Sequence, residues 1–393
     1  MTAYLHALGV VCALGRGKAD VARRLLAGDQ SGMQRRQVTG RSLPVGAVTA
    51  ALPDLTGEPL QYRTRNNQLL LAAAEEIDAD IQAAITRFGR ARIGVVIGTS
   101  TSGIQEATEG LANRTRHGEL PADYHYDHQA LAAPASFLSD RLHLGGPCYA
   151  ISTACTSGAR ALLSASRLLA AGVCDAVLCG GVDTLCDLTL QGFSALEATS
   201  TQCCNPFSVN RDGINIGEAA ALFLMTREPA PLALLGAGAS SDAHHISAPD
   251  PTGRGAIEAM RRALDQAKTE PGQIHYLNLH GTATTHNDAM ESHAVAALFG
   301  DSLMCSSSKP MTGHTLGAAG ALEAAFCWLA MSAYNPARLV PPHRWDGHAD
   351  PELPVLQLAS VGATLPVEGP LRMMSNSFAF GGNNISLILG ETS

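Results

Sequence analysis

Short apolar runs and longer amphipathic runs alternate along the chain. The apolar runs lack the polar alternation of a half-exposed strand, so they predict strands covered by helices on both faces. They lie at residues 93–97, 149–152, 176–179, 232–235, 276–279 and 303–306. Helical runs lie between them, at residues 156–171 and 254–268 and after residues 287 and 315. Because this strand–helix–strand rhythm occurs twice, the sequence predicts two α/β halves with a layered core.

The apolar pattern breaks near residues 228–230, where a charged pair and two prolines, Pro229 and Pro231, interrupt it. Prolines beside charged residues are typical of a connection between structured units. We therefore expect an N-terminal half at residues 1–228 and a C-terminal half at residues 229–393.

Composition narrows the class of protein. The chain has 393 residues, of which 46% are hydrophobic and 16% charged, and 27 Lys+Arg against 35 Asp+Glu give 27 − 35 = −8. Such a chain is globular with a large core, and its acidic balance argues against a nucleic-acid binder. The ten cysteines include no CxxC pair, which argues against a disulfide scaffold or zinc ribbon and favours the reducing cytoplasm.

Two segments could be mistaken for membrane or export signals. Residues 1–14 have no basic stretch ahead of their apolar positions, so they predict a first strand rather than a signal peptide. Residues 315–334 have the length of a membrane span, but Glu323 lies in the middle and Gly317 and Gly320 interrupt it. We interpret this stretch as a helix buried on all sides, and we expect no membrane span.

The segment CYAISTACTSGARALL, residues 148–163, places Cys155 where a strand gives way to a helix. At a helix N-terminus, unpaired N–H groups and the helix dipole favour a thiolate. Small neighbours on both sides would let a substrate approach the sulfur. The segment therefore indicates a nucleophile, although Cys155 could instead pack as a small hydrophobic residue.

Three later segments carry further candidate chemistry: LHGTATTHNDAMESHA with His280, SSSKPMTGHTLGAAGALEAA with Lys309, His314 and Glu323, and SNSFAFGGNN near the C-terminus. Each histidine, taken alone, is more often structural than functional. A cysteine with two histidines, each near a predicted strand end or helix start, suits acyl transfer through a thioester and suggests no metal site.

These segments also resemble a known family. TACTSG at Cys155, NRDGINIGEAAA from Asn210, HGTAT at His280, KPMTGHTLGAAG from Lys309 and NSFAFGGNN from Asn376 are similar, in order and spacing, to motifs of the β-ketoacyl-[acyl carrier protein] synthases, which are condensing enzymes. The resemblance implies a thiolase-like α/β fold in which two similar βαβ halves form a layered α-β-α-β-α core. It places Cys155 in the first half and His280, Lys309, His314 and the Phe380 loop in the second.

The resemblance implies an acyltransferase that carries out a decarboxylative Claisen condensation. Cys155 would hold an acyl group as a thioester, and His280 and His314 would help a malonyl group on an acyl carrier protein lose carbon dioxide. The enolate would then attack the acyl group and give a β-ketoacyl chain two carbons longer, in fatty acid, polyketide or aryl polyene biosynthesis. Backbone amides of Cys155 and Phe380 would form the oxyanion hole.

The same resemblance assigns supporting roles. Lys309 and Glu323 match a buried ion pair near the histidines, and Phe380, with Phe378 beside it, matches a gating aromatic. Thr282 and Thr284 match hydroxyls that hold the phosphopantetheine arm, and Thr101 matches a position that limits the acyl tunnel. Asp288 and Glu291 would lie behind the reacting groups.

Partners and alternatives follow from the family as well. We expect an acyl carrier protein as partner, no cofactor beyond its phosphopantetheine arm, no metal, and a homodimer or a heterodimer with a chain-length-factor-like subunit. Arg63 and Arg65 are either a solvated face or contacts for the acidic carrier protein. The alternative functions are a non-catalytic chain-length-factor-like subunit, which loses the nucleophile, and a thiolase, which needs a second cysteine near the C-terminus.

Some positions depart from the family pattern: Ala283 replaces glycine or serine, Thr285 replaces proline, and Ser208 replaces aspartate. None of these changes removes a reacting group. The RNN segment at 65–67, the GTSTSG segment at 98–103 and the INIGEAAA segment at 214–221 resemble secondary-metabolism synthases, which gives the aryl polyene branch as a hypothesis. The DYHYDH segment at 123–128 is interpreted as a loop or substrate-side wall rather than a metal site. Asp242, His244 and His245 are interpreted as surface residues.

Overall fold

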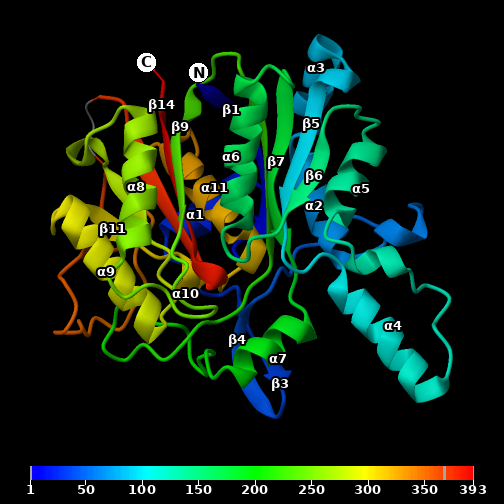
Figure 1. Cartoon of the computed structure of the whole chain (residues 1–393), viewed down its shortest axis with the longest axis horizontal. Coiled ribbons are helices and arrows are strands. Elements are labelled where there is room, and N and C mark those ends of the chain that lie inside the picture. The colour runs from blue at the N-terminus through cyan, green and yellow to red at the C-terminus, as the bar shows by residue number, and fades with distance from the viewer. Residues whose placement is uncertain (1, 366–368, 393) are drawn as a thin grey trace.

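The computed structural model describes residues 2–365 and 369–392. Its strands, apart from a separate two-stranded hairpin, form one large mixed sheet built from two halves (Figure 1). The N-terminal half contributes β1 (Ala3–Cys12), β5 (Ile93–Gly98), β6 (Cys148–Ile151), β7 (Ala176–Asp183) and β8 (Ala219–Thr226). The C-terminal half contributes β9 (Leu232–Ser241), β10 (Tyr276–Asn278), β11 (Met304–Ser306), β13 (Arg372–Ala379) and β14 (Asn383–Glu391).

The two halves have the same strand order and the same strand directions. The first half runs β6-β5-β7-β8-β1 and the second runs β11-β10-β13-β14-β9. In each, the first three strands are parallel and the last two are antiparallel to their neighbours. This repeat confirms the expected thiolase-like fold with two similar halves.

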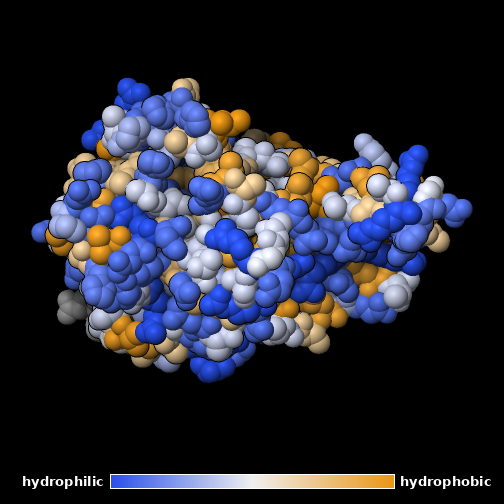
Figure 2. Space-filling model, turned by 90° about the horizontal axis from the view of Figure 1, so that it is seen from below, coloured by the Kyte–Doolittle hydropathy of each residue, from blue (hydrophilic) through white to orange (hydrophobic). Residues whose placement is uncertain are grey.

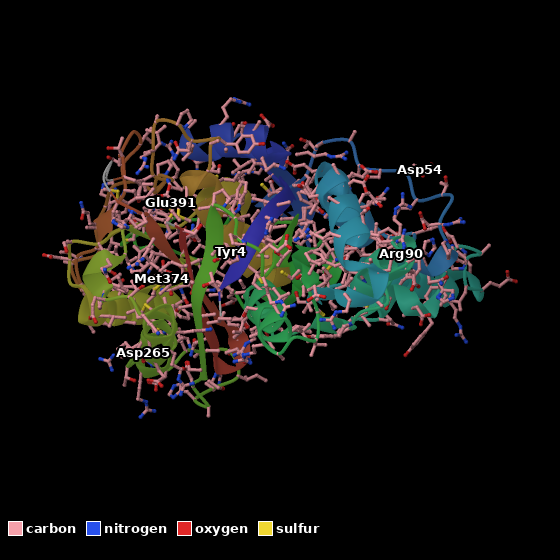
Figure 3. All side chains as sticks on the ribbon, turned by 90° about the horizontal axis from the view of Figure 1, so that it is seen from above. Tyr4, Asp54, Arg90, Asp265, Met374 and Glu391 are labelled. Atoms are coloured by element: carbon pink, nitrogen blue, oxygen red, sulfur yellow. The ribbon has the colours of Figure 1, made fainter. Side chains whose placement is uncertain are left out.

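The halves meet at β1 and β9, where Tyr4 pairs antiparallel with Ala233 (Figure 3). Short strands complete the sheets: β2 (Gly15–Arg16) pairs with β1, and β12 (Gln357–Leu358) extends the second half beyond β11. The predicted domain boundary at residue 228 falls between β8 and β9 and stays a prediction.

Two helices, α6 (Ser157–Ala170) and α11 (Ala319–Met331), lie in the central layer and pack against both halves of the sheet (Figure 1). Small residues let them approach closely: a Cβ on Gly158 would lie 2.8 Å from the amide nitrogen of Ala321. The outer faces are covered by α2 (Arg65–Glu76) and α5 (Ala133–Arg141) in the first half and by α8 (Arg254–Ala267) and α9 (Thr285–Phe299) in the second. These layers give the expected α-β-α-β-α core.

The helices and strands predicted from the apolar runs are all present, with ends shifted by a few residues. The strands β8, β13 and β14 and the helix α5 were not predicted. Several smaller or peripheral elements were not predicted either: α1 (Lys18–Leu26), the hairpin β3 (Met33–Val38) and β4 (Arg41–Gly46), α3 (Asp78–Phe88), α4 (Ile104–His117), α7 (Asp187–Ala195) and the short α10 (Lys309–Thr312). Helix α4 projects from the body as an arm (Figure 1). Within the described residues, no helix has the length and apolar character needed to cross a membrane, and α11 is buried as predicted.

Candidate active site

Cys155 lies in a tight turn between β6 and α6. The preceding residue, Ala154, has a φ of 54°, a left-handed conformation that is rare for a residue with a side chain. Ser157 holds the turn, because its Oγ accepts a hydrogen bond from Thr153 N (2.9 Å) and donates to the Ala154 carbonyl (2.6 Å). The turn points the sulfur into the interior, where the Cys155 residue is 8% exposed.

His280 follows β10, and two carboxylates of α9 lie behind its loop. The carboxylate of Glu291 accepts hydrogen bonds from the backbone N–H of His280 and of Gly281, both at 2.8 Å. Asp288 accepts one from Ala283 N at 3.2 Å, and Ala283 has a φ of 63°. Burial raises the pKa of Asp288 to about 6 and that of Glu291 to about 7.

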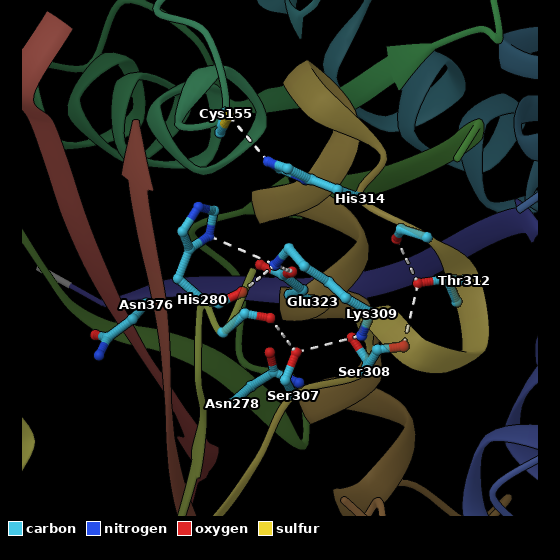
Figure 4. A network of polar contacts seen from close by, with 12 residues as sticks. Cys155, Asn278, His280, Ser307, Ser308, Lys309, Thr312, His314, Glu323 and Asn376 are labelled. Atoms are coloured by element: carbon cyan, nitrogen blue, oxygen red, sulfur yellow. Dashed lines mark hydrogen bonds and ion pairs between the residues drawn. The ribbon is translucent and has the colours of Figure 1, made fainter. Parts of the chain in front are cut away.

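His314 comes from the segment between α10 and α11 and faces Cys155 directly. Its Nε2 lies 3.0 Å from the Cys155 Sγ (Figure 4). The His280 and His314 rings lie edge to face with centroids 5.2 Å apart. The backbone of His314 is held on both sides, since its N–H donates to Asn215 O (2.6 Å) and its carbonyl accepts from Gly217 N (2.9 Å).

A buried ion pair lies behind His280. Lys309 Nζ is 2.6 Å from Glu323 Oε1, donates to the His280 carbonyl, and lies 3.5 Å from His280 Nδ1 (Figure 4). An ammonium group can only donate, so the Nδ1 beside it accepts and the ring proton of neutral His280 lies on Nε2. That Nε2 is the nitrogen turned toward the cavity.

Burial changes the protonation of the three central groups. It lowers the pKa of both His280 and His314 well below the usual range, and the Lys309 charge lowers both further. It raises the pKa of the Cys155 thiol to about 12. Burial therefore opposes the thiolate expected from a helix N-terminus, and α6 begins only at Ser157, two residues after Cys155.

The three central residues could also attract a metal ion, because their ligand atoms lie within 4.8 Å of one another. Metal-bound histidines are normally oriented by a carboxylate or carbonyl that accepts their second N–H. His280 instead has the cationic Lys309 at Nδ1, and its charge opposes a bound cation. The arrangement suits neutral imidazoles better than metal ligands.

These groups open into a cavity of about 400 Å³. It is lined by most of the predicted site residues, namely Cys155, His280, Thr282, Thr284, His314, Phe378 and Phe380. The hydroxyls of Thr282 and Thr284 lie 2.9 Å apart. The other predicted site residues do not line the cavity but lie behind the residues that do: Lys309, Glu323, Asp288 and Glu291. Thr101 is not part of the lining, so its tunnel role stays a prediction.

The structure adds two features of the cavity that the sequence did not reveal. Phe193 of α7 packs against Phe380, with ring centroids 5.7 Å apart. Asp242 also lines the cavity and accepts a hydrogen bond from Asn384 Nδ2 at 2.7 Å, so the prediction that it is a simple surface residue is wrong. The sequence could not show that Asp242 is held in the cavity, because its partner Asn384 lies 142 residues away along the chain.

Other predictions outside the cavity have mixed outcomes. His244 and His245 are exposed as predicted. The segment at 123–128 is a loop that ends in a short turn, and His128 Nε2 lies 2.9 Å from the Leu60 carbonyl. Arg65 is not a free solvated side chain, because its guanidinium pairs with the buried Glu218 at 2.6 Å.

Comparison with known proteins agrees with this geometry. Residues 57–230 match the N-terminal domain of β-ketoacyl synthases, and residues 233–342 match the C-terminal domain. The chain is 31% identical to 3-oxoacyl-[acyl-carrier-protein] synthase 2 of Rhizobium meliloti, over 97% of this chain and 96% of that protein. It is 32% identical to the Staphylococcus aureus protein of the same name, over 82% of this chain and 81% of that protein.

Solved structures give the same result. A chain in the structure of the ketosynthase ApeO with its chain length factor ApeC, from Xenorhabdus doucetiae, is 45% identical with a TM-score of 0.94, covering 100% of this chain and 98% of that one. A β-ketoacyl synthase from Burkholderia phymatum is 27% identical with a TM-score of 0.86, covering all of both chains. A chain of the ishigamide ketosynthase/chain length factor is 26% identical with a TM-score of 0.88, covering 100% of this chain and 99% of that one.

Proposed function

The chain belongs to the β-ketoacyl synthase family and is a condensing acyltransferase, and we propose that Cys155, His280 and His314 carry its reaction. The observation that supports this assignment most strongly is the convergence of the three side chains in one cavity, with 3.0 Å between the sulfur and His314 Nε2. The alternatives of a thiolase and of a non-catalytic subunit are not favoured.

In the first step, Cys155 takes the acyl group from an acyl carrier protein. A thiol with a pKa of about 12 needs a proton acceptor as it attacks, and neutral His314 is within hydrogen-bond reach. The sulfur forms the new thioester, the bond to the carrier's phosphopantetheine sulfur breaks, and the proton passes through His314 to that leaving thiolate. Backbone amides of Cys155 and Phe380 stabilise the oxyanion.

In the second step, malonyl on the carrier protein loses carbon dioxide. The Nε2–H of His280, fixed by Lys309, and that of His314 donate to the thioester oxygen, where the enolate charge develops. The enolate carbon then attacks the Cys155 thioester, the carbon–sulfur bond breaks, and the released sulfur takes up a proton from solvent, which is the one proton that the condensation consumes. Thr282 and Thr284 hold the phosphopantetheine arm in the cavity during both steps, and no other cofactor is needed.

The two steps can be measured separately. With acyl carrier protein substrates, Cys155→Ala should lose acyl loading, while His280→Ala should keep most loading and lose malonyl decarboxylation by about 100-fold, within the range for positioned acid–base groups. Equal loss of both steps in His280→Ala would contradict the proposed division of roles. An exposed histidine variant, His244→Ala, should match the wild type.

A second thiolase-like subunit fits the exposed side of the N-terminal half. Strand β6 is an end strand of the sheet, and its residues are exposed or half-buried. The α4 arm projects on the same side of the molecule (Figure 1), and Figure 2 shows apolar surface there. Leu111 of α4 is exposed, as are the apolar residues Leu120, Tyr126 and Leu131 in the segment that follows it. An open sheet edge beside exposed apolar residues is typical of an interface. Chains similar to this one occur in structures named as ketosynthase and chain length factor complexes.

The pathway is proposed from the degree of similarity. Identity is higher to the chain from the ApeO–ApeC structure than to the 3-oxoacyl synthases, 45% against 31–32%. We place the enzyme in the polyketide or aryl polyene branch rather than in fatty acid elongation. The purified enzyme should prefer aromatic or polyenoyl starters, and elongation of saturated acyl chains alone would contradict this assignment.

We also propose that the enzyme works in the cytoplasm. All ten cysteines are free, and eight of them are buried with raised thiol pKa values, which suits a reducing compartment.

A further inference from the structure

Asp183 is the last residue of β7 and is fully buried, with no exposed surface. A buried carboxylate is costly unless hydrogen bonds satisfy it. Here six donor groups converge on it: the hydroxyls of Thr99, Ser100 and Thr101, and the backbone N–H of Ser100, Thr101 and Gly317. None of the residues assigned to catalysis is among these donors.

The donors come from two parts of the chain that are distant in sequence. Five belong to the turn at residues 99–101 that follows β5, with donor–acceptor distances of 2.7–2.9 Å for Thr99 Oγ1, Ser100 N, Thr101 N and Thr101 Oγ1. The sixth is Gly317 N, at 2.6 Å from Asp183 Oδ2. Gly317 lies three residues after His314, in the short turn that leads into α11.

Close backbone packing makes this connection rigid. A Cβ on Gly317 would lie 2.7 Å from Asp183 Oδ2 and 2.7 Å from Ser100 N, so only glycine fits there. A Cβ on Gly181, two residues before Asp183, would lie 3.0 Å from Ala318 Cα and 3.1 Å from Gly158 Cα. The end of β7 therefore touches both the start of α6, next to Cys155, and the segment that carries His314.

We propose that Asp183 is a positioning residue that fixes the His314 segment against the Cys155 turn and so sets the sulfur–imidazole distance. The inference rests on the proposed roles of Cys155 and His314. It also gives Thr101 a function in this chain, because its hydroxyl and its N–H hold one oxygen of Asp183.

The chemistry of the site predicts that asparagine cannot replace Asp183. All six partners donate, and a carboxylate offers two acceptor oxygens, whereas an amide offers one oxygen and one NH₂ group. In Asp183→Asn the NH₂ group would face a backbone N–H, either in the 99–101 turn or at Gly317. Two donors cannot bond to each other, so the hydrogen bond to one of these two segments would be lost. A shift of about 1 Å at a reacting group is enough for a large loss of rate.

The test is steady-state condensation with acyl and malonyl carrier proteins. Asp183→Asn should lower kcat at least 10-fold and change the KM for malonyl carrier protein less than about threefold. Gly317→Ala, which displaces the same contact from the other side, should show the same split. Thr101→Val removes one hydroxyl and keeps the carboxylate, so its kcat should fall by a smaller factor.

A matched control separates positioning from general loss of stability. Asn335 is buried away from the cavity, and its side chain makes hydrogen bonds to Ala330 O, Leu339 O and Leu339 N. Asn335→Ala should lower the melting temperature while kcat stays near the wild-type value. The proposal would be overturned if Asn335→Ala and Asp183→Asn lost the same amount of melting temperature and their kcat values fell by the same factor.

The remaining outcomes are also decisive. If Asp183→Asn folds and has the kcat of the wild type, the proposal is overturned. If that variant does not fold, the proposal is overturned when Gly317→Ala and Thr101→Val both have the kcat of the wild type. Failure of the wild-type enzyme to load an acyl group would instead contradict the proposed function. Normal wild-type loading with normal turnover in Asp183→Asn would contradict only the positioning role.

Discussion

The two histidines of the site differ in the group that contacts the Nδ1 atom of each ring. His280 has the ammonium of Lys309 at Nδ1, which fixes its proton on Nε2. The Nδ1 of His314 is buried and has no hydrogen-bond partner among the described residues. Nothing there holds the His314 proton on one nitrogen, so His314 can take a proton from Cys155 and release it, while His280 is a fixed donor.

The buried Lys309–Glu323 pair leads to a stability prediction. Glu323→Leu leaves the Lys309 ammonium buried without a counter-charge, so the free energy of unfolding should fall by about 3–5 kcal/mol. The double variant Lys309→Met, Glu323→Leu removes both charges and should recover most of that loss, measured by urea unfolding.

The single and the double variant also test the role of the Lys309–Glu323 ion pair in the reaction. Although the double variant regains stability, its rate of malonyl decarboxylation should stay below that of the wild type, because no ammonium group then fixes the proton of His280 on Nε2. Full recovery of decarboxylation together with stability would show that the ion pair has only a structural role.

The raised pKa of Cys155 predicts how its reactivity depends on pH. The thiol is protonated at pH 7, and below a pKa of about 12 the thiolate fraction rises about tenfold per pH unit. Alkylation of Cys155 by iodoacetamide, followed by mass spectrometry of its peptide, should therefore rise from pH 7 to pH 10 without a plateau. N-acetylcysteine should level off above its ordinary pKa in the same assay. A plateau for Cys155 below pH 9 would contradict the account.

At this scale the sequence predicted which residues meet but not their charge states. Cys155, His280 and His314 were found because each lies at a strand end or a turn next to small residues. The protonation of Cys155 could not be predicted, because desolvation depends on neighbours such as Lys309 and Glu323 that pack around it only in the folded chain. Asp183 and Asp242 were missed for the same reason, since their partners are remote in sequence.

At the scale of elements, two loops support each other at the cavity. The segment 242–249 contacts the Phe380 loop through Gly381 N, which donates to Ile246 O at 2.8 Å, and through Asp242 N, which donates to Gly382 O at 2.9 Å. The Asp242 carboxylate adds its bond to Asn384. Movement of the Phe380 loop therefore requires these contacts to break or to move with it.

We expect Asp242→Ala to loosen the Phe380 loop. The variant loses the carboxylate that holds Asn384 Nδ2 and Asp250 N. Amide hydrogen exchange should become several-fold faster at residues 381–384 and stay unchanged in α11. Asp265→Ala, on the exposed face of α8, is the control and should leave exchange unaltered. Unchanged exchange in Asp242→Ala would show that the two loops move independently.

The elements themselves were partly predictable. Apolar runs identified the parallel strands β5, β6 and β7, of which β5 and β7 are buried along their whole length and β6 lies at the edge of the sheet. The antiparallel strands β13 and β14 were not assigned, because they carry buried polar residues such as Asn376 and Ser386, which satisfy each other only in the folded chain. Strand β8 was not assigned either, although it is buried along its whole length. Helix α4 was missed because it projects from the body and buries only Ala107 and Gly110, so no run of buried apolar residues marks it in the sequence.

At the scale of the whole molecule, the β6 edge and the α4 arm predict a dimer. Leu131 is 43% exposed and Leu111 44% exposed, so charge there should not disturb the fold of a single chain. Leu111→Asp with Leu131→Asp should weaken subunit association at least 10-fold, measured by analytical ultracentrifugation with the chain alone and with its partner subunit. Val355→Asp, at a still more exposed apolar position in the other half, should leave association unchanged. Unaltered association in the double variant would place the interface elsewhere.

The central claim is that Cys155 is the acylated nucleophile, and intact-mass spectrometry tests it most directly. The protein, with its partner subunit where one is required, is incubated with acyl carrier proteins bearing different acyl groups and then with malonyl carrier protein. The wild type should gain one acyl mass, which Cys155→Ala and Cys155→Gln should not, and should then release a chain two carbons longer. Acylation that persists in both variants, or no acylation of the wild type with any carrier, would contradict the claim.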